Sequence, residues 1–401
     1  VLACAGYGGV KSHPHFDYDH SKNRMDAGSE GTDEDLTYVE ALYIAPALII
    51  TCLIFACSGC SRSGPIRKVG SVEFSDQVHT ALPADRGHSR WAFAGVSTVG
   101  VCNIRSGEVT WSQSAPDGYA FVSLRPDRDG GRIAAILINK KEYEEWVKVF
   151  QGPTPGPCRI WILESDSGRI VERIKGPRLK GVVSRTDTMR WSEDGDRLFL
   201  LRPSKLSAWD IKSKKKLWES MLPFEVAKKM GLAPWMDMNG EDKIFVWERV
   251  GFSIWDGDSG KVERKHRMPK GVGSIAAEWS GKFVYITSLK LRPPMSLLRF
   301  NLETEEFTTV AELKGKTAHW LEISPDGHWL AVDMQKDLGN LNRVVRIYRC
   351  RPEADFVEIG HIEGLYVGDS CGWTSDGRIG VWDEERLTVW GISDKSEKER
   401  Q

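Results

Sequence analysis

The chain has 401 residues, with 55 Lys and Arg against 56 Asp and Glu, so that its formal net charge is −1. This balance excludes nucleic acid as a predicted partner, because nucleic-acid binding requires a concentrated basic surface. The eight Cys do not form two spaced C-x-x-C pairs, so we predict no structural zinc site.

Residues 1–38 are polar, and we expect them to form a disordered tail. Three His and two Asp lie between His13 and His20, a composition that suits metal binding. A disordered tail, or a stretch that precedes a true start at Met25, explains the same residues. We therefore predict no metal site and no cofactor.

Residues 39–60 contain the most apolar segment of the chain. Ala41 to Cys60 runs for twenty residues without a charge, which is long enough to cross a bilayer as a helix. Three interpretations remain open: an uncleaved membrane anchor, a lipoprotein signal acylated at Cys60, or an ordinary cleaved signal. In the first two, residues 41–60 attach the protein to a membrane.

The sequence around this segment leaves the side of the membrane open. Arg62, Arg67 and Lys68 follow it and acidic residues precede it, so the positive-inside rule favours a cytoplasmic C-terminal domain. The Ser-Gly-Cys-Ser sequence around Cys60 resembles a lipobox and favours an exported domain. Residues 61–70 are expected to link the segment to the domain that follows.

A five-residue phrase recurs in the rest of the chain. It reads Trp-Ser-Glu-Asp-Gly at 191–195, Ile-Ser-Pro-Asp-Gly at 323–327 and Trp-Thr-Ser-Asp-Gly at 373–377, each time before an apolar run. Asp-Gly suits a tight hairpin, because Gly reaches positive φ freely and Asp bonds its own backbone. Short strands that repeat every 40 to 50 residues or so are typical of a β-propeller.

A second turn, Ser-Gly or a related pair, follows an alternating apolar run and allows the repeats to be counted. It occurs seven times, at 106–107, 167–168, 213–214, 259–260, 304–305, 353–354 and 394–395. We therefore predict an all-β fold, a seven-bladed β-propeller of four-stranded antiparallel blades over residues 71–394. One N-terminal hydrophobic helix, a transmembrane or signal-anchor segment, is expected to precede it.

The last repeat lacks a fourth strand, because residues 395–401 form a charged, solvated tail. Residues 71–75 precede the first repeat and have no other place in it. We predict that they form the outer strand of the last blade, which would close the ring and remove its open sheet edges.

Two motifs resemble known repeat families. Ser324-Pro-Asp-Gly327 followed by Trp-Leu-Ala-Val resembles the repeats of TolB-like propellers, and Trp209-Asp210 resembles the Trp-Asp dipeptide of WD40 repeats. The resemblance extends over residues 71–392 and implies a propeller fold. It implies no particular function, since such repeats occur in many unrelated proteins.

Loop lengths indicate which face of the disc binds a partner. The two tight turns of each blade share one face, the turn face, while the second-to-third-strand loops and the blade connections share the other, the loop face. The longest insertion, residues 139–157, is expected to include a short helix. Since long loops on a rigid scaffold carry function, we predict that the loop face binds a protein or peptide partner or an anionic ligand. The candidate contacts are Trp146, Phe150, Lys290, Arg292, Lys336 and Arg343.

Two functions remain open, and the first is a membrane-tethered scaffold that binds its partner through the loop face. The second is a propeller enzyme, a hydrolase or quinoprotein-like protein, with Asp237 and Glu278 as candidate carboxylates in the central channel. We predict no catalytic residue, because no nucleophile elbow occurs. The closest match to a quinoprotein repeat, Ala208–Trp218, has Lys214 in place of Gly. The scaffold is therefore preferred.

Overall fold

The computed structural model describes the chain between residues 65 and 393, with gaps. The described residues are 65–75, 78–85, 89–149, 157–178, 189–202, 204–223, 235–238, 241–248, 251–267, 277–279, 282–287, 295–313, 317–335, 343–350, 356–365, 371–382 and 385–393. The chain divides into two compact units, Val1–Arg62 and Ser63–Gln401, and every described residue belongs to the second. The predicted tail, the segment 41–60 and Cys60 lie outside the described residues. Within the described residues, no helix has the length and apolar character needed to span a bilayer.

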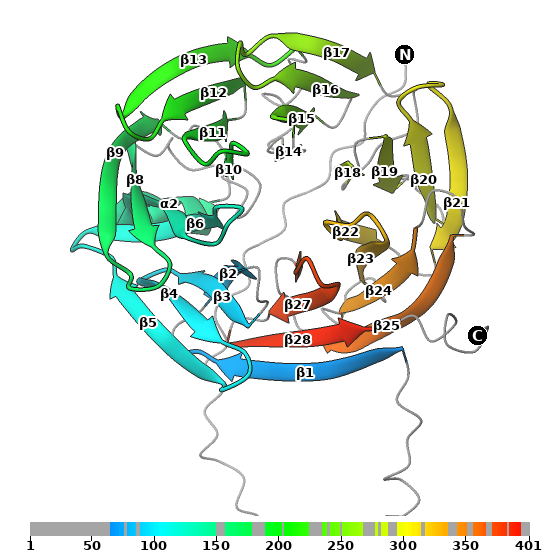
Figure 1. Cartoon of the computed structure of the whole chain (residues 1–401), viewed down its shortest axis with the longest axis horizontal. Coiled ribbons are helices and arrows are strands. Elements are labelled where there is room, and N and C mark those ends of the chain that lie inside the picture. The colour runs from blue at the N-terminus through cyan, green and yellow to red at the C-terminus, as the bar shows by residue number, and fades with distance from the viewer. Residues whose placement is uncertain are drawn as a thin grey trace, which may run out of the picture. The chain divides into compact units, whose positions relative to one another are not determined.

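The described strands form seven four-stranded antiparallel sheets arranged as blades around a ring (Figure 1), which confirms the predicted all-β, seven-bladed propeller. From the inner to the outer strand, blade 1 is β2 (Val78–Pro83), β3 (Arg90–Gly95), β4 (Thr98–Asn103) and β5 (Glu108–Ser114). Blade 2 is β6 (Tyr119–Pro126), β7 (Arg132–Asn139), β8 (Pro157–Glu164) and β9 (Ile170–Arg178). Blade 3 is β10 (Met189–Trp191), β11 (Arg197–Arg202), β12 (Lys205–Asp210) and β13 (Lys215–Met221).

The remaining blades follow the same order around the ring. Blade 4 is β14 (Trp235–Met238), β15 (Lys243–Trp247), β16 (Gly251–Asp256) and β17 (Val262–Arg267). Blade 5 is β18 (Ala277–Trp279), β19 (Phe283–Thr287), β20 (Met295–Asn301) and β21 (Phe307–Leu313). Blade 6 is β22 (Thr317–Ile323), β23 (Trp329–Gln335), β24 (Arg343–Arg349) and β25 (Val357–Leu365). Blade 7 is β26 (Cys371–Trp373), β27 (Arg378–Trp382), β28 (Arg386–Ile392) and, from the other end of the chain, β1 (Ile66–Glu73).

The ring is closed by β1, as predicted. It pairs antiparallel with β28 from Ile66 opposite Ile392 to Glu73 opposite Arg386, so the strand begins within the stretch expected to be a linker. Ile66 packs against the core between blades 6 and 7, and Val72, 1% exposed, packs into the core between blades 7 and 1. The apolar contacts of Ile66 explain why the strand starts before residue 71.

The core lies between neighbouring blades, where Trp fills much of the space. Trp91, Trp255 and Trp382 are each 1% exposed or less, so their large rings contribute much of the buried apolar area. The Trp of the recurring phrase also binds the preceding blade. Trp191 Nε1 donates a hydrogen bond to a main-chain oxygen of blade 2, at 2.9 Å, and Trp373 Nε1 to one of blade 6, at 3.0 Å.

The Asp-Gly turn joins the inner strand of a blade to its second strand, as predicted. In the turn at 192–197, the Ser192 hydroxyl donates to Asp194 Oδ1 at 2.6 Å and accepts from the Arg197 backbone N–H at 2.9 Å. Gly195 has φ of 70° and its N–H donates to Ser192 O at 3.0 Å. The turns that begin at Ser324 and Thr374 repeat these bonds.

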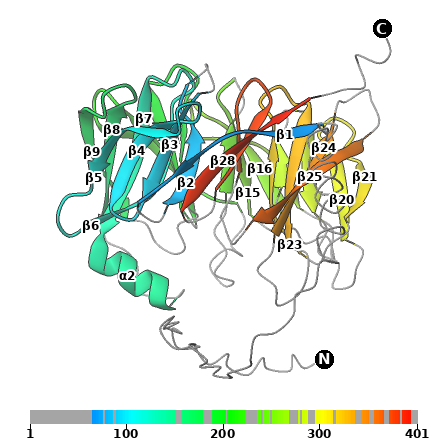
Figure 2. The same ribbon diagram turned by 90° about the horizontal axis from the view of Figure 1, so that it is seen from below.

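Antiparallel pairing of consecutive strands separates the two faces of the ring. The first-to-second and third-to-fourth strand turns lie at the turn face. The second-to-third strand loops, the blade connections and helix α2 (Lys140–Val149) lie at the loop face, and Figure 2 shows α2 projecting from that face. Both ends of the propeller lie at the turn face, where Ser393 N donates to Pro65 O at 2.8 Å.

Candidate interaction face

Helix α2 is the largest described feature of the loop face, and it confirms the helix expected in the insertion 139–157. Asn139 begins the helix, since its side-chain oxygen accepts a hydrogen bond from Lys141 N at 3.0 Å. Lys140 N donates to Gly118 O at 2.8 Å, which attaches the first turn of the helix to the connection between blades 1 and 2. The half-buried Tyr143 packs against the core between blades 2 and 3. These contacts hold the first turn of the helix on the ring, with Lys141 and Glu144 exposed.

Basic side chains gather at the loop-face end of blade 3. Arg202 at the end of β11 and Lys205 at the start of β12 lie at this end and form ion pairs with Glu219 of β13. Lys216, nearer the turn face in β13, forms a third ion pair with Glu219. The hydrogen bond from Lys205 is the main cause that lowers the pKa of Glu219 to about 2. One carboxylate thus faces three cations, two of them at the loop-face end, which leaves an excess of positive charge at this edge of the face.

A buried ion pair lies at the loop-face end of blade 6. Arg343, the first residue of β24, pairs with Asp333 of β23 at 3.0 Å, across the stem of the loop 336–342. Asp333 is 4% exposed, and its Oδ1 has no hydrogen-bond partner. Burial raises the pKa of Asp333 to about 6, against the opposing effect of Arg343. A carboxylate so placed is typical of functional sites, although ion pairs in the core have the same property.

The backbone register shows how unusual Asp333 is. In blade 6, the last residue of the inner strand, Ile323, pairs with Leu330, and Asp333 follows three residues later. Counting three residues from the corresponding pair in blades 3, 4 and 7 gives Leu201, Trp247 and Trp382. Those three side chains are buried and apolar. Sequence reasoning missed Asp333, although a charged residue inside the apolar run Leu-Ala-Val-Asp-Met was a visible signal.

The candidate contacts predicted on the loop face are only partly described. Arg343 is at that face, but its side chain is 13% exposed and paired with Asp333. Trp146 is in α2, and its side chain lies outside the described residues, as do Phe150, Lys290, Arg292 and Lys336. Contacts are described for Arg343 alone among the six, so the role of these residues stays a prediction.

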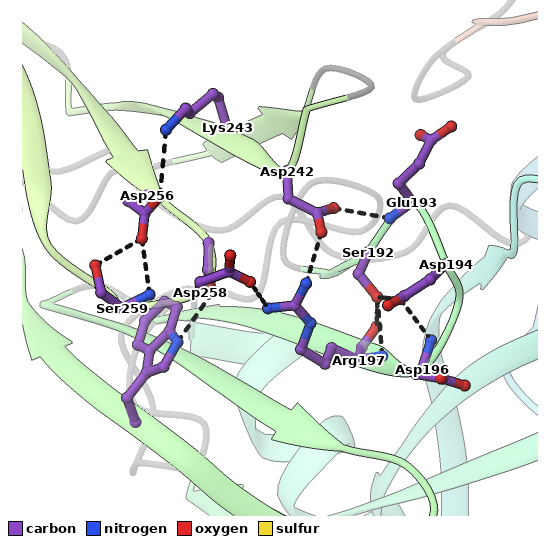
Figure 3. A network of polar contacts seen from close by, with 12 residues as sticks. Ser192, Glu193, Asp194, Asp196, Arg197, Asp242, Lys243, Asp256, Asp258 and Ser259 are labelled. Atoms are coloured by element: carbon purple, nitrogen blue, oxygen red, sulfur yellow. Dashed lines mark hydrogen bonds and ion pairs between the residues drawn. The ribbon is translucent and has the colours of Figure 1, made fainter.

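The turn face differs because it is crossed by ion pairs between blades (Figure 3). Arg197 at the start of β11 pairs with Asp242, at 2.6 Å, and with Asp258, and both carboxylates belong to turns of blade 4. Arg90 of blade 1 bonds to Asp166 of blade 2 in the same way. Arg132 of blade 2 donates to a main-chain oxygen of blade 3 at 2.8 Å. Polar groups on this face thus bind neighbouring blades to each other.

The central channel carries charges on its inner strands. Arg190 of β10 lies 3.5 Å from Asp237 of β14, one of the two carboxylates considered for an enzyme site. Glu278 occupies the equivalent position in β18, where its backbone pairs with Tyr285, and its side chain lies outside the described residues. No group of three or more His, Cys, Asp or Glu able to hold a metal ion occurs among the described residues.

In comparisons with known proteins, neither a protein-family model nor a curated protein matches the chain. The architecture is therefore known from the geometry of the blades. A propeller fold is compatible with an interaction scaffold and with an enzyme, so the choice depends on the two faces and the channel.

Proposed function

We propose that the protein is a membrane-tethered scaffold that binds a protein or peptide partner through its loop face. The observation that carries this proposal is the contrast between the faces. The turn face is occupied by hydrogen-bonded hairpins and by Arg90, Arg132 and Arg197, which bind neighbouring blades. The loop face carries α2, the basic edge of blade 3 and the buried pair of blade 6, all of them additional to the repeat.

The tether in this proposal is the uncharged segment 41–60. It joins the propeller through Pro65, at the turn face, whereas α2 begins at the opposite end of the blades. Flanking Arg and Lys support a cytoplasmic propeller, and the lipobox-like sequence at Cys60 supports an exported one. Protease treatment of intact cells that carry a C-terminal tag distinguishes the two, because only an exported propeller loses the tag.

We also propose that the repeats are of the TolB-like type. The support is the turn at Ser324-Pro-Asp-Gly327, in which the hydroxyl and carboxylate of the phrase bond to each other and to the backbone. The same arrangement occurs at Ser192 and Thr374, so three blades share this turn.

The scaffold is tested with the full chain in membranes. We expect the double variant Trp146→Ala/Arg292→Ala to recover its partner at least about tenfold less well in affinity purification, since a few aromatic and Arg contacts dominate binding energy. The matched control is Lys212→Ala/Lys282→Ala, which changes two exposed residues at the turn face. Equal recovery by the loop-face variant and the control would contradict the proposal.

The alternative is an enzyme, a hydrolase or quinoprotein-like protein, with its site in the channel. The observation that favours it is the Arg190–Asp237 pair beside the position of Glu278. If the channel holds a divalent cation, Ca²⁺ should raise the melting temperature of the protein, and Asp237→Asn should abolish that rise.

A further inference from the structure

The outer strand of blade 5, β21, is an exposed sheet edge. It lies on the outside of the ring (Figure 1) and pairs on one side only, with β20. Residues 303–309 are exposed without interruption, including Phe307, whose ring lies tilted against that of Phe300 with the centroids 4.6 Å apart. A free edge of this kind presents unpaired main-chain N–H and C=O groups to an extended chain.

The outer strands of blades 2, 3 and 4 are protected against such pairing, whereas β21, like β5 of blade 1, has a stretch without charge. Charged side chains, Lys above all, discourage the addition of a further strand. The outer strands of blades 2, 3 and 4 carry such residues along their length, for example Arg173, Lys215 and Lys265. Between Phe307 and Ala311, β21 has no charge.

The charge around β21 is also opposite to that of blades 2, 3 and 4. The rim segments of blades 2, 3 and 4, each a third-to-fourth-strand turn with its outer strand, contain four Lys or Arg each. The corresponding segment of blade 5, Asn301–Leu313, contains four Glu and no Lys or Arg. Three of the four glutamates precede Phe307, where β21 starts at the turn face, so the acidic end of the strand is at the turn face.

Three of these glutamates, Glu303, Glu305 and Glu306, lie together in the turn before β21. Glu303 pairs with Lys282 at 3.1 Å, and both side chains are more than half exposed, so this pair is weak. Glu305 lies 3.9 Å from His266, but burial lowers the pKa of His266, and a neutral imidazole leaves the charge of Glu305 uncompensated. No described residue forms an ion pair with Glu306. The turn therefore presents negative charge to solvent.

We propose that β21 is a docking edge for a basic, extended segment of a partner protein, which adds to blade 5 as a fifth, antiparallel strand. The uncharged stretch from Phe307 to Ala311 supplies the main-chain pairing, and the turn at 303–306 binds the basic residues of the segment. Because β21 runs from the turn face to the loop face, an antiparallel strand ends at the turn face. The basic residues therefore belong at the C-terminal end of the segment. This edge is separate from the loop face, and the two proposals stand independently.

The probe is a fluorescent peptide, acetyl-Thr-Val-Thr-Val-Thr-Lys-Arg-Lys-amide, titrated against the detergent-solubilised full chain and followed by polarisation. We expect it to bind at least about fivefold more tightly than the same composition with Lys-Arg-Lys at the N-terminal end. We expect raising the salt from about 50 to 300 mM to weaken binding roughly tenfold, since exposed charges are screened. A peptide with Glu in place of the basic residues should not bind.

Two variants separate charge from strand pairing. Glu305→Lys/Glu306→Lys should weaken binding of the probe at least about tenfold. The turn tolerates Lys at position 305, because Lys214 occupies the same turn position in blade 3 with φ of 59° against 60° for Glu305. Thr309→Lys, which places a charge in the bare edge, should have an effect of similar size. The matched control is Thr110→Lys in β5, the outer strand of blade 1, with no change expected.

The proposal is overturned if both peptide orders bind equally, or if Thr309→Lys leaves binding unchanged while the glutamate variant abolishes it. The second result would mean charge attraction without strand addition. Melting temperatures within a few degrees of the unchanged protein exclude unfolding as the cause of lost binding. If the double variant fails to fold, Glu306→Gln replaces it with a smaller expected loss in the same direction.

Discussion

Single residues of the repeat have roles that the sequence predicted only in part. The need for Gly after Asp was predicted from turn chemistry, and the positive φ of Gly195, Gly327 and Gly377 confirms it. The sequence also indicated a Gly in the third-to-fourth-strand turn. In the structure, this second Gly is needed for an additional reason. Gly260 lies against the face of Trp218 in the preceding blade, where a Cβ would approach the ring to 2.5 Å.

Two glycines, Gly260 and Gly327, allow the effect of positive φ to be separated from the effect of contact with a Trp ring. Gly260→Ala should lower the free energy of unfolding by about 2–4 kcal/mol, because it adds overlap with the Trp218 ring to the strain of a positive φ. Gly327 has φ of 71° against 66° for Gly260, and no atom lies within 4 Å of the position that a Cβ would occupy there. Gly327→Ala should therefore cost only about 1 kcal/mol. Urea unfolding of both variants gives the comparison, and equal losses would show that Trp218 plays no part.

At the scale of elements, the contacts between outer strands and neighbouring turns explain departures from the repeat. Trp218 Nε1 donates to a main-chain oxygen of the turn in blade 4 at 3.0 Å, and Trp111 of blade 1 does the same in blade 2 at 2.7 Å. Blade 2 has Glu172 at the position of this Trp, and blade 3 has Lys214 at the position of the Gly. The two side chains form an ion pair. The Lys214 that breaks the quinoprotein-like pattern thus complements a change in the blade before it.

The buried pair at the stem of the loop 336–342 gives a pH dependence. Burial raises the pKa of Asp333 to about 6, whereas an unfolded chain has a value of about 4. The folded protein therefore holds a proton that the unfolded chain releases, so the contribution of this group is full below pH 4 and is lost as the pH rises through 6. The difference is about 3 kcal/mol at neutral pH.

Asp333→Asn tests this dependence, because Asn has a similar shape and does not ionise. Between about pH 5 and 7.5, the unchanged protein should lose about 1.4 kcal/mol of stability relative to the variant in urea unfolding, which is the part of the total loss that falls above pH 5. Glu312→Gln removes an exposed carboxylate and is the control for the loss of one negative charge. Parallel stability curves for the unchanged protein and Asp333→Asn would contradict the assignment.

At the scale of the whole molecule, stability depends on the closure of the ring. β1 contributes the outer strand of blade 7 and packs Val72 beside Trp382 and Leu387 in the core between blades 7 and 1. Without this strand, β28 becomes an open edge and an apolar core is exposed to water. The two ends of the propeller are bonded to each other through Ser393 and Pro65, so closure joins residues that are far apart in the chain.

Two valines of β1 measure the effect of closure. Val72→Asp should lower the melting temperature by at least about 10 °C, because it buries an unpaired charge in a side chain position that is 1% exposed. Val69 is 38% exposed on the same strand, and Val69→Asp should change the melting temperature by no more than about 2 °C. Deletion of residues 70–76 should act like Val72→Asp. A small, equal change in both valine variants would show that β1 is not needed for the ring.

The sequence by itself determined the architecture, because its signals are local. Asp-Gly turns, alternating apolar runs and a missing fourth strand in the last repeat each depend on a few adjacent residues, and they sufficed for the blade count and for the closing strand. The membrane segment 41–60 and the contacts on the loop face were predicted from the sequence in the same way and stay predictions. Only the tertiary structure decided what neighbouring blades do to each other. The burial of Asp333, the match of Glu172 with Lys214 and the uncompensated acidic edge of β21 depend on residues that the ring brings together from distant parts of the chain.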